Sequence, residues 1–296
     1  MGEEKNAQII NYSLDYMESK NLEHTEQSNL LPPHRGGGLG RGSSLLPHGE
    51  AGRGPEAGRG PSFVILADGS FPTHDIPLDI LHNAKYLCCC DGAGMELISR
   101  GIMPDAIVGD CDSMTEEFKE RYKDIIHVVE EQEYNDLTKC TKHVLEIQNS
   151  EFKIQNDTSA ETMVGKAADR LLPNGEAGRG PTIAYLGCTG KREDHTLGNI
   201  SLMAYYMEEL GIKPYMFTDY GVFMPAHGTQ VFVSAPRLQV SIFNISCKEL
   251  TSEGLRWNAY PYRQLWQGTL NEATGDSFTI HADGTYIVYV TYDAKT

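Results

Sequence analysis

The sequence predicts an α/β domain with a mostly parallel sheet, followed by a smaller all-β domain. From residue 62, short apolar runs alternate with stretches of helical periodicity. Strand–helix units in this order build a Rossmann-like sheet with helices on its faces. Beyond about residue 220, apolar and polar residues alternate along short segments, which is typical of strands in a β-sandwich.

Six apolar runs account for the strands of the α/β domain. They are Phe63–Ala67, Tyr86–Cys90, Ala106–Val108, Ile126–Val129, Thr182–Leu186 and Tyr215–Phe217. Two helices between them have clear signals. Asn135 is a good N-cap for a helix with an apolar face of Leu137, Cys140, Val144 and Leu145. The other helix is expected from about Asp194 to Leu210, with an apolar face of Leu197, Ile200, Ala204 and Met207.

The all-β domain is expected to contain four main strands with a period of two. They are Gln230–Val233, Leu238–Phe243, Ser277–Ile280 and Thr285–Val290. Asp283 and Gly284 are typical turn residues, and we expect them to join the last two strands as a hairpin.

The domain boundaries follow from composition. "LLPHGEAGRGP" at 45–55 recurs as "LLPNGEAGRGP" at 171–181, with a partial copy at 56–61. Segments so rich in Gly, Pro and Arg cannot build a core, so we predict a solvated linker rather than an RNA-binding segment. The expected organisation is an extension at 1–61, an α/β domain at 62–219 with an inserted loop at 151–181, and a β-sandwich domain at 220–296.

Composition limits the partners. The net charge of −16 argues against nucleic acid, because phosphate backbones need a basic surface. The longest apolar runs are strand-sized, so we expect no membrane association and a cytoplasmic location. The seven cysteines include no CxxC pair, so we expect small buried side chains in a reducing compartment rather than disulfides or a zinc site.

Carboxylates follow four of the predicted strands. They occur in "CCCDGAG" (Asp91), "GDCDS" (Asp110 and Asp112), "QEYNDLTK" (Asp136) and "GCTGKREDH" (Asp194). In a parallel sheet the carboxyl ends of the strands share one edge, so these groups are expected to meet there. Oxygen ligands without histidine or thiolate partners suit Mg²⁺, with Asp110 and Asp112 as the best ligand pair.

Other residues at this edge suit phosphate. Asp136 and Asp194 lie near helix starts, whose N–H groups attract anions, and Arg192 offers a planar guanidinium. Together with the carboxylates, these residues indicate phosphoryl-type transfer from a nucleotide.

The "GDCDS" motif also has a purely structural interpretation. Ser113 followed by Glu116 is a capping box, which predicts a helix start at Ser113.

Taken together and in this order, the motifs resemble those of the thiamine pyrophosphokinase family. The quoted segments are "CCCDGAG", "PDAIVGDCDS", "QEYNDLTK", "LGCTGKREDHTLGNI", "EGLRW" and "GTLNE". The resemblance covers roughly residues 62–150 and 182–296. It implies transfer of the diphosphate of ATP to the hydroxyl of thiamine, which gives thiamine diphosphate and AMP, in a homodimer with its site at the subunit interface.

The resemblance also implies roles for single residues. Asp110, Asp112 and Asp136 would hold Mg²⁺, and Arg192 and Asp194 would position phosphates and the reacting oxygen. Asp91 and Ser113 would lie on the nucleotide side together with Arg192. Gln132, Trp257 and Asn271 would bind thiamine, with Trp257 stacking on a thiamine ring from the partner subunit. Either Asp136 or Asp194 would accept the proton.

Some features depart from the family or have structural interpretations. Family members commonly have Ser-Asn where this chain has Leu270-Asn271, so a hydroxyl contact to substrate depends on Thr269. Trp257 could equally be sandwich core, and His195 is expected to cap or pack rather than act as a base. Lys139 has no assigned role, since it could touch phosphate or face solvent.

Three rival functions remain at this point. Asp110-Cys111-Asp112 could be the DxD of a Mg²⁺-dependent nucleotide-sugar transferase, although that leaves the other motifs unexplained. A dehalogenase-type phosphatase would need Thr or Val where Met114 stands. The third is a non-catalytic nucleotide- or thiamine-binding protein of the same fold.

Overall fold

The computed structural model describes residues 63–157 and 180–294. The extension predicted at 1–61 and most of the insert predicted at 151–181 lie outside these residues. The parallel strands are β1 (Phe63–Leu66), β2 (Tyr86–Cys90), β3 (Ala106–Gly109), β4 (Ile126–Val128), β5 (Thr182–Leu186) and β6 (Lys213–Phe217). They pair in the order β6-β5-β1-β2-β3-β4, and every pair is parallel.

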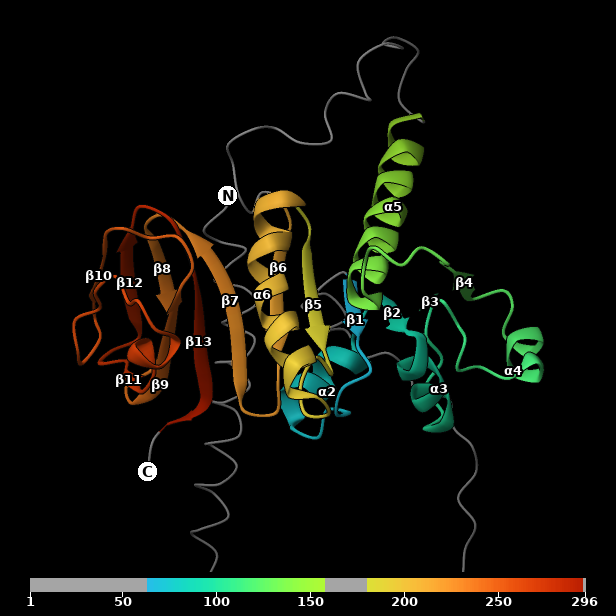
Figure 1. Ribbon diagram of the computed structural model, residues 1–296, viewed down its shortest axis with the longest axis horizontal. Helices are drawn as coiled ribbons and strands as arrows, with labels where there is room; N and C mark the ends of the chain where they lie inside the picture. Colours follow the sequence, from blue (N-terminus) through green and yellow to red (C-terminus); the bar gives the residue numbers. More distant parts are fainter. Residues whose placement is uncertain (1–62, 158–179, 295–296) are drawn as a thin grey trace, which may run out of the picture.

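The remaining strands are antiparallel. They are β7 (Gly221–His227), β8 (Gln230–Val233), β9 (Leu238–Asn244), β10 (Leu250–Glu253), β11 (Asn271–Glu272), β12 (Ser277–Ala282) and β13 (Thr285–Ala294). Because β7 pairs with β6, the main sheet continues as β11-β9-β13-β7-β6 and contains ten strands (Figure 1). Strands β10, β12 and β8 form a second sheet of three strands.

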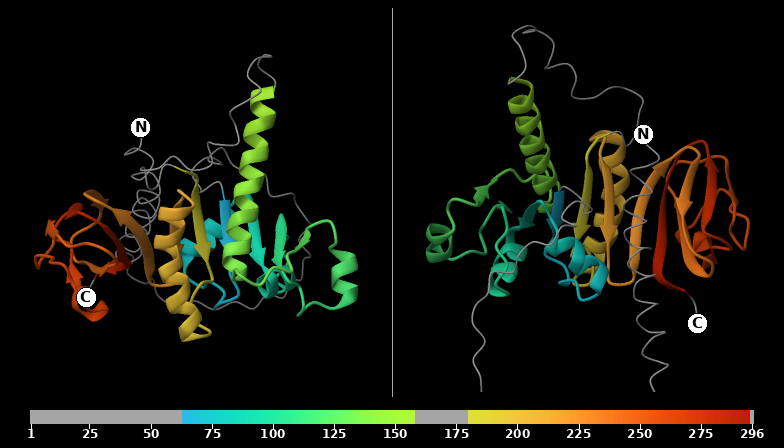
Figure 2. Two further views of the ribbon diagram at one scale, coloured as in Figure 1. Left: turned by 45° about the horizontal axis from the view of Figure 1, so that its top comes forward. Right: turned by 180° about the vertical axis from the view of Figure 1, so that it is seen from behind.

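Helices cover both faces of the parallel part. They are α2 (Asp75–His82), α3 (Asp91–Ser99), α4 (Glu116–Arg121), α5 (Asp136–Asp157) and α6 (Glu193–Glu209), and a 3₁₀ turn, η2, spans Leu265–Gly268. Alternate strand residues face opposite sides, so Val64 packs in the cluster that contains α2 and α3, and Ile65 in the cluster that contains α5 and α6. Figure 2 shows the antiparallel part at one end of the sheet and α4 at the other.

The predicted fold class is confirmed: a mixed sheet, parallel in its N-terminal part and flanked by helices, is followed by a smaller antiparallel β region. The predicted cap of α5 is also present, because the backbone N–H of Thr138 donates to Asn135 Oδ1 at 3.0 Å. The predicted apolar face of α6 is wrong at Leu197, which is 63 % exposed. Ala204 and Met207 of the predicted face are buried, together with Met203 and Tyr206, which were not predicted.

Aromatic rings fill the space between the two sheets of the antiparallel part. Within the smaller sheet, Phe232 of β8 stacks on Phe278 of β12 at 5.1 Å between ring centroids. Across the sandwich, Phe232 meets Tyr286 of β13 edge-on at 6.3 Å. The predicted hairpin at Asp283–Gly284 is wrong, because β12 and β13 belong to different sheets. The turn carries the chain across the sandwich, and backbone N–H groups at 248 and 249 donate to the Asp283 carboxylate.

All seven cysteines are free and buried, as predicted. Burial raises the pKa of Cys89, Cys140 and Cys188 well above that of a free thiol. Among the described residues, no helix combines the length and apolar character needed to cross a bilayer.

Candidate active site

Five adjacent parallel strands deliver the polar residues of the candidate site. Their order in the sheet is β5-β1-β2-β3-β4, and their carboxyl ends lie along one edge. The residues that follow them in this order are Lys191, Arg192 and Asp194 after β5, Asp68 after β1, Asp91 after β2, Asp110 and Asp112 after β3, and Asp136 after β4. Asp68 was not predicted as a site residue.

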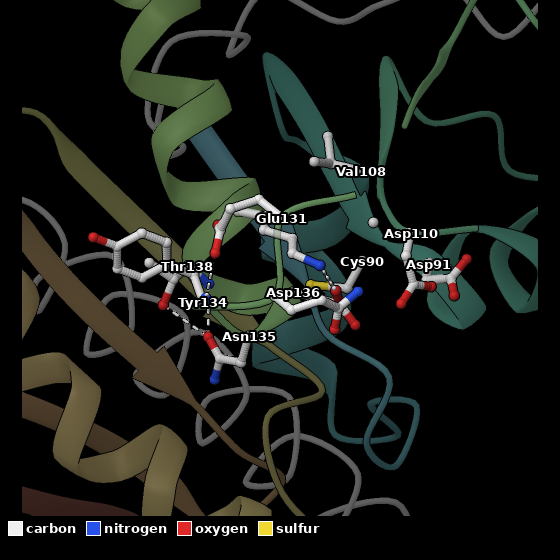
Figure 3. Close-up of polar contacts among 12 residues, drawn as sticks. Cys90, Asp91, Val108, Asp110, Glu131, Tyr134, Asn135, Asp136 and Thr138 are labelled. Atoms are coloured by element: carbon white, nitrogen blue, oxygen red, sulfur yellow. Dashed lines mark hydrogen bonds and ion pairs between the residues drawn. The ribbon is translucent and has the colours of Figure 1, made fainter. Parts of the chain in front are cut away.

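Three of the predicted carboxylates lie together (Figure 3), and Asp68 is near them. Burial raises the pKa of Asp91, and a hydrogen bond of 3.2 Å from Ser113 Oγ opposes this rise. The charges of Asp110, Asp136 and Asp68 raise the pKa of Asp91 further. The four carboxylates therefore form one electrostatic group that a cation would stabilise.

Ser113 belongs to this group and does not cap a helix. The structure corrects the capping-box prediction: Thr115 is the N-cap of α4, and its Oγ1 accepts from the backbone N–H of Phe118 at 3.2 Å. The hydroxyl of Ser113 is therefore available to Asp91.

The two aspartates of "GDCDS" have different surroundings. Cys111 between them is buried and adopts a left-handed φ of 57°, which turns the chain sharply. Asp110 is half-buried, and its Oδ1 accepts from the backbone N–H of Asp112 at 3.3 Å. The Asp112 side chain is exposed, and its charge acts on Lys119, which is hydrogen-bonded to Glu116.

Lys139, which had no predicted role, lies in the site. Its side chain is only 3 % exposed, and Nζ contacts Asp136 Oδ1 at 3.2 Å. A buried ammonium is costly unless it is paired. The i, i+3 spacing of Asp136 and Lys139 on a helix was a signal for this contact that the sequence offered.

The carboxylate group suits Mg²⁺. Asp91 Oδ1 is buried, and among the described residues it has no hydrogen-bond partner. Within residues 63–157 and 180–294, no group of three or more His, Cys, Asp or Glu is arranged to hold a metal ion by itself. Mg²⁺ typically takes one or two carboxylates and completes its shell with water and substrate phosphates, so an incomplete set of oxygen ligands fits it.

Arg192 and Asp194 bind each other at the start of α6. The guanidinium contacts the carboxylate at 2.6 Å and 3.1 Å through two nitrogens. This hydrogen bonding lowers the pKa of Asp194 and raises that of Arg192, although both side chains are exposed. His195 was expected to cap or pack. It is exposed, and the N-cap of α6 is Arg192.

Of the three predicted thiamine-binding residues, Trp257 and Asn271 lie in the antiparallel part, away from the carboxylates. Trp257, between β10 and β11, is 53 % exposed, which excludes the sandwich-core interpretation. Its backbone is bound by the side chain of Asn271, which accepts from Trp257 N at 3.1 Å and donates to Trp257 O at 2.7 Å. Asn271 is itself buried, and its two hydrogen bonds position Trp257. Gln132 is exposed on the loop after β4, and its amide donates to Glu130 O at 3.4 Å.

One chain cannot bring Trp257 to the carboxylates. Asn271 lies on β11 at one edge of the ten-stranded sheet, and Asp110 follows β3 near the other edge (Figure 1). Eight inter-strand steps separate β11 from β3, which corresponds to about 38 Å along the sheet.

Two family models match this chain. The model described as "Thiamin pyrophosphokinase, catalytic domain" matches residues 78–214, which contain Asp91, Asp110, Asp136 and α6 but not Asp68. The model described as "Thiamin pyrophosphokinase, substrate-binding domain" matches residues 221–289, which contain Trp257 and Asn271. Together the matches span well over half of the chain.

The chain belongs to the thiamin pyrophosphokinase family.

Solved thiamin pyrophosphokinases share its fold. The enzyme from Candida albicans is 18% identical, with a TM-score of 0.61 over 79% of this chain and 92% of the other. The yeast enzyme is 18% identical, with a TM-score of 0.58 over 78% of this chain and 86% of the other. The Bacillus subtilis enzyme is 21% identical, with a TM-score of 0.55 over 78% and 99%. A comparison with curated proteins found no match.

Membership in the thiamin pyrophosphokinase family does not favour the nucleotide-sugar transferase alternative. One departure from the family pattern is clear at Leu270, which is 72 % exposed and has a left-handed φ of 66°. The hydroxyl of neighbouring Thr269 donates to Trp266 O at 2.7 Å, so in this structure it is already occupied.

Proposed function

We propose that this protein is a thiamine diphosphokinase, which transfers the diphosphate of ATP to the hydroxyl of thiamine and gives thiamine diphosphate and AMP. The observation that carries this proposal is the carboxylate group of Asp91, Asp110 and Asp136 within the segment that the family's catalytic model matches. Carboxylates grouped this closely need a cationic ligand, and a magnesium-bound polyphosphate supplies one.

The proposed reaction is an in-line attack of the thiamine oxygen on the β-phosphorus, with AMP as the leaving group. Asp110, Asp112 and Asp136 would hold Mg²⁺, and the unpartnered oxygen of Asp91 adds a further candidate ligand. When bound, Mg²⁺ neutralises charge on the phosphates. Lys139 holds the Asp136 carboxylate in place through its contact of 3.2 Å. Asp136 or Asp194 accepts the proton of the thiamine hydroxyl or orients it.

Arg192 binds phosphate in this proposal by exchanging its present partner. Its guanidinium and the Asp194 carboxylate are both exposed, so a phosphate can reach the same nitrogens. Once released from Arg192, Asp194 can hydrogen-bond the thiamine hydroxyl. Asp91 and Ser113 lie on the nucleotide side, and Gln132 lies near the boundary between thiamine and diphosphate.

Thiamine would stack on Trp257 of a second subunit. The exposed indole, with Arg256 at 4.9 Å from its ring, offers a flat surface to an aromatic ring. The span of about 38 Å within one chain supports a homodimer in which each site combines two subunits. We further propose that the enzyme acts in the cytoplasm, with neither nucleic acid nor a membrane as partner, in keeping with its net charge of −16.

The test is AMP formation by the purified full chain with ATP, Mg²⁺ and thiamine. We expect AMP and thiamine diphosphate in equal amounts, and no AMP without thiamine. Asp110→Asn should abolish turnover while circular dichroism stays unchanged. Asp124→Asn, at an exposed position of the same domain, is the matched control and should retain activity. ADP as the product, or full activity of Asp110→Asn, would refute the proposal.

A further inference from the structure

The loops that follow β1 and β5 are joined along their backbones. The N–H groups of Ala67, Gly69 and Ser70 donate to the carbonyls of Leu186, Gly187 and Thr189 at 2.7 to 2.8 Å. A Cβ at Gly69 would overlap the carbonyl oxygens of Gly187 and Thr189. This close approach fixes the position of Lys191, which follows the second loop.

Lys191 is placed against Asp68 of the first loop. Its Nζ contacts Asp68 Oδ1 at 2.8 Å, and both side chains are 51 % exposed. Many exposed ion pairs contribute little because both side chains are mobile. Here the two backbones are already joined, so the pair is held in a defined place.

Asp68 lies in surroundings that suit a phosphate. Its Oδ2 is 2.9 Å from the position that a Cβ on Gly92 would take, so the carboxylate lies against the first turn of α3. The N-cap residue of α3, Cys90, makes no side-chain hydrogen bond to that turn. A helix N-terminus and an ammonium on either side of an anion are the elements of a phosphate site.

We propose that Lys191 binds the polyphosphate of the nucleotide. In the free protein Asp68 takes the place of the phosphate, and Lys191 releases Asp68 when the nucleotide binds. The inference deepens the proposed function and rests on it. Asp68 is close enough to act on Asp91, so its release adds an unpaired charge to the carboxylate group. Mg²⁺ offsets that charge, and the exchange at Lys191 is therefore coupled to the metal.

The experiment is calorimetric titration of the full chain with ATP, with and without Mg²⁺ and without thiamine. Lys191→Met should weaken Mg-ATP binding about tenfold or more, as expected for a lost charged hydrogen bond, and Lys191→Arg should restore most of it. Asp68→Asn should tighten the binding of metal-free ATP, because the internal competitor is gone. In the Lys191→Met background, Asp68→Asn should bring a much smaller gain.

The matched control is Lys123→Met. Lys123 pairs with Glu120 at the same distance of 2.8 Å on the surface near α4, and its loss should leave ATP binding unchanged. Wild-type affinity in Lys191→Met would overturn the proposal, and so would an absence of ATP binding by the wild type. An equal gain from Asp68→Asn in both backgrounds would overturn the role of Asp68.

AMP formation by the same wild-type preparation separates the two proposals. If Mg-ATP binds and Lys191→Met weakens binding, but no AMP forms with thiamine, the proposed reaction fails and the Lys191 inference stands. If AMP forms and Lys191→Met binds Mg-ATP normally, the inference fails and the reaction stands.

Discussion

Lys139 is a buried lysine that contacts Asp136 in the proposed active site. Its ammonium is almost fully buried, while its partner Asp136 remains 43 % exposed. Lys139→Met keeps the length of the side chain and removes the charge, and water can still solvate Asp136. Breaking a buried ion pair is costly when it leaves the other charge buried and unpaired, and the exposure of Asp136 avoids that cost.

We therefore expect Lys139→Met to lower kcat by about 10²-fold, as for loss of a preorganised charge, with little change in Tm. Steady-state AMP formation and thermal unfolding measure the two effects. Lys142→Met is the matched control, because Lys142 lies over the Tyr134 ring, 3.1 Å from its centroid, and has no assigned role in the site. Full kcat with a lowered Tm would show that Lys139 is only structural.

The sequence identified Asp91, Asp110 and Asp136 because each follows an apolar run directly or through a short loop. It missed Asp68 and Lys139 for different reasons. Asp68 also follows a predicted strand directly, but "ADGS" is an ordinary turn signal. Lys139 was given no role because it could touch phosphate or face solvent. Burial of a lysine depends on tertiary packing, which local pattern does not reveal.

The contact between the loops after β1 and β5 should contribute to stability. Gly69→Ala places a Cβ against two backbone carbonyls that cannot move without breaking the loop contact. The free energy of unfolding should fall by about 1 to 3 kcal/mol, the usual cost of overpacking. Gly275→Ala is the control, because no atom lies within 4 Å of its added Cβ, and it should be neutral or slightly stabilising. Urea denaturation measures both, and equal stabilities would contradict the prediction.

Asp219 anchors the start of α2 to the β6–β7 connection. Its Oδ1 accepts from the backbone N–H groups of Thr73 at 2.8 Å and His74 at 3.0 Å. Burial of the Asp219 carboxyl opposes ionisation, but the hydrogen bonds from His74 and Thr73 outweigh it and lower the pKa. A lowered pKa means that the ionised form stabilises the fold above about pH 4 and that this contribution disappears as the pH falls through the folded-state value.

Asp219→Ala should therefore lower the free energy of unfolding by about 1 to 2 kcal/mol at pH 7, since it removes these hydrogen bonds. The difference from wild type should shrink as the pH falls below about 4. Asp219→Asn keeps an acceptor oxygen without a charge, so it should retain part of the stability and lose this pH dependence. Urea titrations across pH measure it, and a difference that grew in acid would contradict the assignment.

Most of the predicted strands are present with bounds close to those expected. β2, β5 and β8 have the predicted bounds, and most others differ by a few residues at one end. β7, β10 and β11 were not predicted. In β7, Gly221 and Pro225 are poor signals for a central strand. The hairpin prediction failed at Asp283, because a local turn signal does not specify which sheet receives the next strand.

In the proposed dimer, each site would combine Asp110 of one subunit with Trp257 of the other. Asp110→Asn and Trp257→Ala should each be nearly inactive at low thiamine concentration. Mixed, unfolded together and refolded, they should recover about a quarter of wild-type activity, because half of the dimers are mixed and each has one intact site.

The control mixes Asp110→Asn with Asp112→Asn, which would damage the same half of the site and should give no recovery. Light scattering of the wild type checks that a dimer is present. Recovery in neither mixture, from refolded dimers, would rule out a shared site.

The fold class was predictable because buried parallel strands and half-buried antiparallel strands leave different periodicities. The sequence did not predict that the parallel and antiparallel parts share one ten-stranded sheet. β6 and β7 pair through backbone hydrogen bonds, which require no particular side-chain pattern. The predicted boundary near residue 219 lies in the short link between these paired strands, and the division into domains stays a prediction. Function was predictable only through motifs, because fold alone does not specify it.

Alkylation of the seven buried thiols can measure how often the fold opens locally. A thiol must be exposed and ionised before an alkylating reagent attacks it, and burial suppresses both conditions. Labelling by iodoacetamide in native buffer should therefore be limited by how often the sheet and its covering helices separate. A substrate that holds β2 and α5 together should slow the modification of Cys90 and Cys140, whose sulfurs are 3.3 Å apart, more than that of Cys247 in the sandwich.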